Sequence, residues 1–377
     1  GVLIGVAALA ALLVASQVPA VVVYTARLAL AAVALACCTW LLLPTVERAG
    51  AALSDADAAL VRSLWAITLC AIGVRLAGAL YPVYSAHDLP LNVERLVRTI
   101  GGTLVSTNRS FEFRSGVTVY PPGPYLALLP AFLPGLSAGL LVQAGNAMVD
   151  GLSALATGLL ALKLGANRRT AQFAAVLYAG LPVMLTSLYW GHSAQIFGQA
   201  LMAPLAITLL VAFERPRFRY WAIASALLAA AFLSHIGVTV IAIAWMGALW
   251  LLARVRATLA WRPWWHLTLA LGAAGIAGLA LVYGPTLALK AEQTAQVGER
   301  VLHEAYSSQI LISRAAVISF YQFGWPLALA GLAFLPRIWS RTRGASDMLV
   351  AWIAVALLFC AIELITGLQA RYFVFAA

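Results

Sequence analysis

The residues best suited to acid–base chemistry lie in a long polar segment, residues 81–120, that separates two apolar stretches. His87 and Asp88 are adjacent in it, and Pro90 favours the start of a helix just after them. Because a helix dipole stabilises negative charge at the N-terminus, we expect Asp88 to stay ionised or to share this position with a bound anion. An ionised carboxylate can take a proton from a reacting hydroxyl, while the structural alternative is a helix cap. His87 is a partner or metal co-ligand of Asp88, or a solvated loop histidine.

Three polar or aromatic side chains lie close together in a second break, residues 189–195. Trp190 offers a stacking face, and His192 and Gln195 offer hydrogen-bond partners, so all three are candidates for binding a polar ligand. Tryptophan and tyrosine also collect at membrane interfaces as anchors, which is the alternative interpretation of this segment.

Two further breaks carry ionisable groups. His235 lies in a turn between apolar runs, where it is a site candidate or a helix cap. Residues 290–313 include Lys290 and His303, and Arg314 follows them. This mixed-charge segment is either a loop that closes over a ligand or a solvated connector.

The elements that must position these groups are membrane helices. The 377-residue chain is 63% hydrophobic and 10% charged with a mean hydropathy of +0.93, whereas soluble domains carry about 25% charged residues. This composition excludes a disordered chain, a nucleic-acid-binding protein and a secreted disulfide scaffold. The net charge of +11 comes from basic clusters between apolar spans, which the positive-inside rule explains without a polyanionic partner. The cysteines lie in apolar stretches without metal-ligand spacing: Cys37, Cys38, Cys70 and Cys360.

Hydropathy predicts an all-α, polytopic transmembrane bundle of about eleven spans. Residues 1–61 are expected to form an extra helical hairpin before a core of residues 62–377, within one transmembrane domain. We also expect the chain to be a fragment at both ends. The predicted spans lie near residues 2–16, 20–43, 62–80, 137–163, 170–189, 194–213, 219–234, 237–253, 265–289, 314–335 and 348–368.

The basic clusters are separated from one another by two spans, so they all fall on one side, which the positive-inside rule assigns to the cytoplasm. Four of the five histidines then lie on the opposite, non-cytoplasmic face, and His266 is the exception. The clusters are Lys163, Arg168 and Arg169; Arg215, Arg217 and Arg219; Arg254, Arg256 and Arg262; and Arg337, Arg341 and Arg343.

The segment 81–136 is expected to contain two membrane-associated pieces. Residues 91–102 carry an apolar stripe with charged residues opposite, which indicates a short amphipathic helix on the membrane surface. Residues 121–136 are apolar but rich in proline and too short for a confident span, so we interpret them as re-entrant or interfacial. The stripe is Val93, Leu96, Val97 and Ile100, and the opposing charges are Glu94, Arg95 and Arg98. Elsewhere, Arg75 and Asp150 fall inside spans, where a structural ion pair is the simplest expectation.

The order of these features resembles the membrane glycosyltransferases of the C-type (GT-C) superfamily, including mannosyl- and arabinosyltransferases that use polyprenyl-phosphate sugars. In both, an aspartate follows a span in the first outer loop, here His87-Asp88, and a juxtamembrane helix comes next. The loop then closes on an aromatic-Pro-Pro motif, here Tyr120-Pro121-Pro122-Gly123. The late Arg371-Tyr372 before a final apolar run is also similar, and the resemblance covers residue 62 to the end.

The resemblance implies an inverting transfer of a sugar from a polyprenyl phosphate to a lipid, glycan or protein acceptor, in the plasma membrane and on the non-cytoplasmic face. Asp88 would be the general base, or with His87 a ligand of a divalent metal such as Mg or Mn. Arg371, with Arg314 and Lys290 as weaker candidates, would bind the donor phosphate. The substrate-binding candidates are Tyr120, Trp190, His192, Gln195, His235, His303 and Tyr372.

Two other functions remain open at this stage. A secondary transporter or lipid-carrier flippase would show repeats and charged or broken helices at the bilayer midplane, whereas here the polar groups gather at one face. A non-catalytic membrane scaffold would keep the architecture without needing the carboxylate of Asp88.

Overall fold

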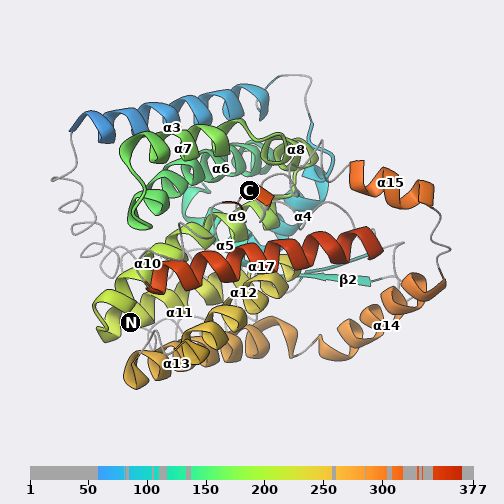
Figure 1. Ribbon diagram of the computed structural model, residues 1–377. Helices are drawn as coiled ribbons and strands as arrows, with labels where there is room; N and C mark the ends of the chain where they lie inside the picture. Colours follow the sequence, from blue (N-terminus) through green and yellow to red (C-terminus); the bar gives the residue numbers. More distant parts are fainter. Residues whose placement is uncertain are drawn as a thin grey trace.

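The structure is a computed structural model that describes residues 58–79, 81, 85–103, 106–109, 117–132, 137–256, 260–284, 286–303, 308–316, 329–330, 333 and 343–366. In these ranges the chain is a helical bundle with one two-stranded ribbon (Figure 1). Seven apolar helical stretches are long enough to cross a membrane, so the chain is a multi-pass integral membrane protein. The predicted spans at 2–16 and 20–43, and most of 314–335, lie outside the described residues.

The seven stretches coincide with predicted spans. They are α3 (Ala58–Ala79), α6 (Ala138–Lys163), α7 (Arg168–Gly180) with α8 (Pro182–Trp190), α9 (Ser193–Ala200) with α10 (Met202–Glu214), α12 (Ile236–Val255), α13 (Trp261–Gly278) with the π-helical turn η3 (Leu279–Tyr283), and α17 (Arg343–Thr366). The predicted span at 219–234 is the 15-residue helix α11 (Phe218–Phe232), which at about 1.5 Å per residue is short for a straight crossing.

The remaining elements belong to connecting segments. Between α3 and α6 lie α4 (Leu89–Ile100), the antiparallel strands β1 (Ser106–Arg109) and β2 (Val117–Tyr120), α5 (Gly123–Leu128) and the 3₁₀ turn η2 (Leu129–Ala131). Between α13 and α17 the structure describes α14 (Leu287–His303) and α15 (Ser308–Ala316). The ribbon of β1 and β2 was not predicted, and α5 is far too short to span a bilayer.

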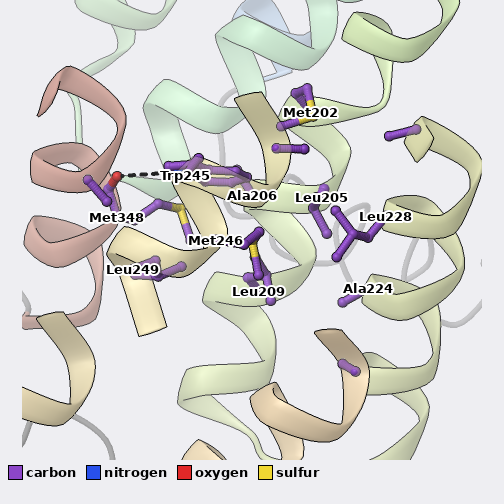
Figure 2. Packing of buried hydrophobic residues seen from close by; sticks show 14 of the residues in the cluster. Met202, Leu205, Ala206, Leu209, Ala224, Leu228, Trp245, Met246, Leu249 and Met348 are labelled. Atoms are coloured by element: carbon purple, nitrogen blue, oxygen red, sulfur yellow. Dashed lines mark hydrogen bonds between the residues drawn. The ribbon is translucent and has the colours of Figure 1, made fainter. Parts of the chain in front are cut away.

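The largest hydrophobic cluster lies where α10, α11, α12, α13 and α17 pack together (Figure 2). Leu205 and Leu209 of α10 and Trp245 of α12 are buried in this cluster, and the Trp245 indole N–H donates to the Met348 carbonyl of α17 at 3.3 Å. These helices are apolar on most faces, as expected where one side meets protein and the other lipid.

A buried ion pair joins the other helices. Arg75 of α3 donates from Nε to Asp150 of α6 at 2.5 Å, and its Nη1 donates to the Ala179 carbonyl at 3.1 Å. The phenol of Tyr178 donates to the second carboxylate oxygen of Asp150 at 3.0 Å. The expected pair is therefore confirmed, and it connects α3, α6 and α7.

Three of the seven stretches are interrupted. Leu181 between α7 and α8 has an extended backbone (ψ 124°), because the following Pro182 disfavours helical geometry in the residue before it. Leu201 separates α9 from α10, and α13 ends in the π-helical turn η3. In each stretch the interruption leaves one short piece, and these are α8, α9 and η3.

The two ends of the bundle differ in charge. At one end, Lys163 binds Glu214 at 2.7 Å, and Arg256 pairs with Asp347, so the ends of α6, α10 and α12 meet the start of α17. We call this the basic end. The opposite end carries α4, β2, α14 and α15, at the right of Figure 1, and we call it the α4 end.

Candidate functional site

Two segments far apart in sequence are bound together at the α4 end. The backbone N–H of Asp88 donates to the Trp190 carbonyl at 2.9 Å, and the side-chain amide of Asn92 donates to the Gly191 carbonyl at 2.8 Å. Gly191 ends α8 with φ +78°, a left-handed conformation that glycine adopts without strain. A Cβ there would lie 3.0 Å from Ala86 Cβ, so the close approach of the two segments needs this glycine.

The carboxylate of Asp88 is not used in holding the fold. Asp88 is the residue that precedes α4, but its side chain makes no capping hydrogen bond. It is half-buried, and the described residues give it no hydrogen bond or ion pair. The capping alternative therefore fails for this side chain, and the carboxylate is not engaged by the helix that it precedes.

Aromatic rings surround this position. The ring of His87 meets the Trp190 indole edge-on with centroids 5.1 Å apart, and the ring of His192 lies nearly parallel to the indole at 6.5 Å. Trp190 is 43% exposed, so part of the indole is accessible to a ligand. Four candidates from two segments, with Asp88 among them, are thus neighbours.

The Tyr-Pro-Pro-Gly motif packs on a third segment. The N–H of Gly123 donates to the Leu233 carbonyl at 2.7 Å, and a Cβ at Gly123 would lie 2.5 Å from that oxygen, so only glycine fits. His235, two residues further along, accepts from the Gly237 N–H through Nδ1 at 3.1 Å. His235 therefore caps α12, the second of its two interpretations.

Helix α4 is amphipathic, but its buried face is not the one expected. Leu96 is fully buried, whereas Val97 is 53% exposed and Arg95, expected on the outer side, is 4% exposed. Asn92 and Thr99 are also buried. The expectation for Arg95 was wrong, because α4 packs a polar stripe against α5 and β2. There the Tyr120 ring contacts Arg95, and the Tyr125 hydroxyl bonds Asn92.

The buried stripe forms a small network. The guanidinium carbon of Arg95 lies 3.2 Å from the centroid of the Tyr120 ring, and Nη1 donates to the Tyr125 hydroxyl at 3.4 Å. That hydroxyl donates to the amide oxygen of Asn92 at 2.8 Å. Burial raises the pKa of Tyr125, against the lowering influence of Arg95, and the nearby carboxylate of Asp88 adds to the rise. Tyr125 is therefore a neutral donor at physiological pH.

A small pocket lined in part by Asn92 has a cavity volume of about 10 Å³, which is room for about one water molecule. Gln143, Asn146 and Ser193 line it. Asn146 donates to Ser193 at 2.7 Å, but its amide oxygen and the amide nitrogen of Gln143 are buried without a partner among the described residues. These amides can bind a water molecule or a ligand hydroxyl.

The other candidates are placed less directly. Gln195 is buried in α9, and Arg314 donates to the Leu364 carbonyl of α17 at 3.3 Å. Lys290 and His303 lie on α14, but their side chains are outside the described part of the structure. Arg371 and Tyr372 also lie outside the described residues.

The residues of the buried stripe of α4 and of the pocket beside it were not predicted as site residues. Asn92, Arg95, Tyr125, Asn146 and Ser193 join the candidate site only through contacts across segments. One signal was present in the sequence: Asp88, Asn92, Arg95 and Thr99 are spaced i, i+4, i+7 and i+11, which puts a polar stripe on one helical face.

The ligands for a metal ion are few. His87 and Asp88 are adjacent, but in the described ranges no group of three or more histidine, cysteine, aspartate or glutamate side chains converges. The described residues do not make a protein-built metal site, so the chemistry below is derived from the side chains.

Comparisons with known proteins do not assign the chain to a family. No family model matches the chain, and no curated protein matches it.

Proposed function

We propose that the chain is a membrane glycosyltransferase that moves one sugar from a polyprenyl-phosphate carrier to a lipid, glycan or protein acceptor, with inversion at the anomeric carbon. The site would lie on the non-cytoplasmic face of the plasma membrane. Asp88 would be the general base.

The single observation that carries the proposal is the state of the Asp88 carboxylate. It lies at a helix N-terminus next to His87, whose ring contacts the partly exposed Trp190, and among the described residues it neither caps α4 nor pairs with a cation. A half-buried carboxylate that makes no stabilising contact is a candidate catalytic group, because moving a charge out of bulk water costs free energy that such contacts normally offset.

The reaction assigns the carboxylate one step. The acceptor hydroxyl gives its proton to Asp88 while its oxygen bonds to the anomeric carbon, and the bond from that carbon to the phosphate oxygen breaks. The electron pair leaves with the polyprenyl phosphate. A positioned base of this kind contributes about 10²- to 10⁴-fold to such a rate.

The surroundings of Asp88 suit a sugar. Trp190 presents an aromatic face for the apolar side of a sugar ring, and His192 is stacked on it. The amides of Gln143 and Asn146, each with one unpartnered atom in the described structure, could bind hydroxyls near Asn92.

The charge distribution supports the proposed side of the membrane. The salt-bridged, arginine-rich termini of α6, α10 and α12 lie at the basic end, opposite α4. Under the positive-inside rule the basic end faces the cytoplasm, and Asp88 then faces away from it.

The experiment is sugar transfer by the purified protein from a panel of synthetic polyprenyl-phosphate hexoses and pentoses to a lipid extract. The key variant is Asp88→Asn, which keeps the shape of the side chain and removes its basicity. We expect transfer to fall by at least about a hundredfold. The matched control is Glu94→Gln in α4, because Glu94 is exposed and its described contact is the ion pair with Arg98.

Equal transfer by wild type and Asp88→Asn would remove Asp88 from the mechanism. Absence of transfer by the wild type with every donor would instead favour a lipid-carrier flippase or a scaffold. A flippase is then separated from a scaffold by measuring movement of a labelled polyprenyl phosphate across proteoliposome membranes.

A further inference from the structure

Arg95 is a buried cation without a counter-ion in the described part of the chain. Arg95 is 4% exposed, and its Nε is buried with no hydrogen-bond partner among the described residues. The contacts it does make are to neutral groups, the ring of Tyr120 and the hydroxyl of Tyr125. A guanidinium stays charged at any physiological pH, so this charge is not relieved by losing a proton.

No neighbouring ionisable group forms an ion pair with it in the described structure, and this includes the carboxylate of Asp88, which lies close enough to Tyr125 to act on its hydroxyl. Glu94 precedes it on the helix but points to the exposed side, where it binds Arg98 at 2.5 Å. Tyr125 remains a neutral phenol, because burial raises its pKa. The buried Arg75 shows the contrast, since Asp150 pairs with it directly. A buried charge of this kind is expected to be completed by an anion.

The spacing along α4 relates Arg95 to the proposed base, Asp88. Asp88 and Arg95 are seven residues apart, which places them on one helical face about 10 Å apart along the axis. Asn92 lies between them and is held by Gly191 and Tyr125. If the anomeric carbon of the lipid-linked sugar lies near Asp88, its phosphate lies on the side of Arg95.

We propose that Arg95 binds the phosphate of the lipid-linked donor, with the Tyr120 ring fixing the plane of its guanidinium; this assignment rests on the proposed function. The donor is a phosphodiester with one negative charge. When the bond to the anomeric carbon breaks, the leaving polyprenyl phosphate gains a second negative charge, while the proton from the acceptor goes to Asp88. A fixed guanidinium at that phosphate stabilises the charge as it develops.

The test is a binding measurement that needs no sugar transfer. Thermal unfolding and ligand titration are followed for the detergent-solubilised full chain with three probes: a polyprenyl monophosphate, the matching polyprenol and inorganic phosphate. We expect the wild type to bind the lipid phosphate at least about tenfold more tightly than the polyprenol, the scale of one charge-assisted contact. If inorganic phosphate binds as tightly as the polyprenyl monophosphate, the site recognises phosphate without the lipid, which contradicts the assignment to a lipid-linked donor.

Two variants on the same helix make the test specific. Arg95→Met should bind the polyprenyl phosphate no more tightly than the polyprenol, while Arg98→Gln, changed at an exposed position, should behave as the wild type. The ligand-free Arg95→Met protein should unfold at the same or a higher temperature, because it no longer buries an unpaired charge. A protein that fails to fold or melts earlier would mean that Arg95 is structural, which overturns the proposal.

The result also separates this inference from the proposed function. Asp88→Asn should keep full binding of the polyprenyl phosphate while losing transfer. Undiminished binding by Arg95→Met would refute the phosphate assignment even if the wild type transfers sugar.

Discussion

Arg75 and Asp150 form an ion pair inside the bundle, with Nε of the arginine 2.5 Å from a carboxylate oxygen. Their side chains are 0% and 3% exposed, and Tyr178 donates to the other carboxylate oxygen. Neither charge would be stable alone among apolar helices, so each is tolerated because of the other.

Removing one member of this pair should therefore be costly. We expect Asp150→Asn to lower the free energy of unfolding by about 3–5 kcal/mol, because it leaves Arg75 buried without a counter-charge. The double variant Arg75→Met with Asp150→Leu should recover much of the loss. Chemical denaturation in detergent measures both, with Arg62→Gln on the exposed side of α3 as the control. Equal losses in the single and double variants would show that the pair is not what stabilises this region.

Trp190 should contribute to sugar binding through its exposed face. We expect Trp190→Ala to lower kcat/KM for transfer by about fivefold, mainly through KM, since an aromatic contact is worth about 1 kcal/mol. Trp190→Phe should keep most of the activity. Trp261→Ala removes an exposed tryptophan from α13 near the basic end and should have no effect. If Trp190→Ala acts only on stability, the ring is an interface anchor.

Transfer should not require a divalent metal. The described residues provide His87 and Asp88 but no group of three ligands, so we expect activity to persist after dialysis against EDTA. Mg and Mn are added back in separate samples as the check. Loss of transfer that either ion restores would make Asp88 a metal ligand rather than the base.

The pH dependence of stability should carry a contribution from Tyr125. Its pKa is raised in the folded state by burial, so folding favours the neutral phenol. As pH rises above about 10, the unfolded chain loses this proton first, and the stabilisation is lost as pH passes through the folded pKa. Tyr125→Phe should cost about 1–3 kcal/mol at pH 8, because Asn92 loses its donor.

The difference between wild type and Tyr125→Phe should then shrink as pH rises from 9 to 11. Denaturant unfolding at each pH measures it. A constant difference over that range would mean that the Tyr125 hydroxyl titrates normally.

Hydropathy was enough to locate the described membrane helices. A run such as Ile236–Val255 is long, apolar and bounded by polar residues, so its identity does not depend on its neighbours. Local patterns also explain helix α4 and the turn at Gly191, since proline and glycine act through their own backbone geometry.

The arrangement of the site could not be read in the same way. Arg95 was expected on the outer side because an amphipathic helix at a membrane usually buries its apolar stripe. Which face is buried depends on what packs above it, and Tyr120 and Tyr125 come from segments more than twenty residues away. The meeting of Asp88 with Trp190 is likewise a property of the fold and has no local signal.

The interruptions in three spans give the two halves of the bundle different mechanical character. In each case the longer piece runs from the basic end, as in α7 with 13 residues, α10 with 13 and α13 with 18, while the pieces at the α4 end have nine, eight and five. Short pieces can tilt about their breaks without unravelling the longer ones. If the proposed transfer takes place, we expect the bundle to open for a carrier lipid at these short pieces, while the longer pieces at the basic end stay packed.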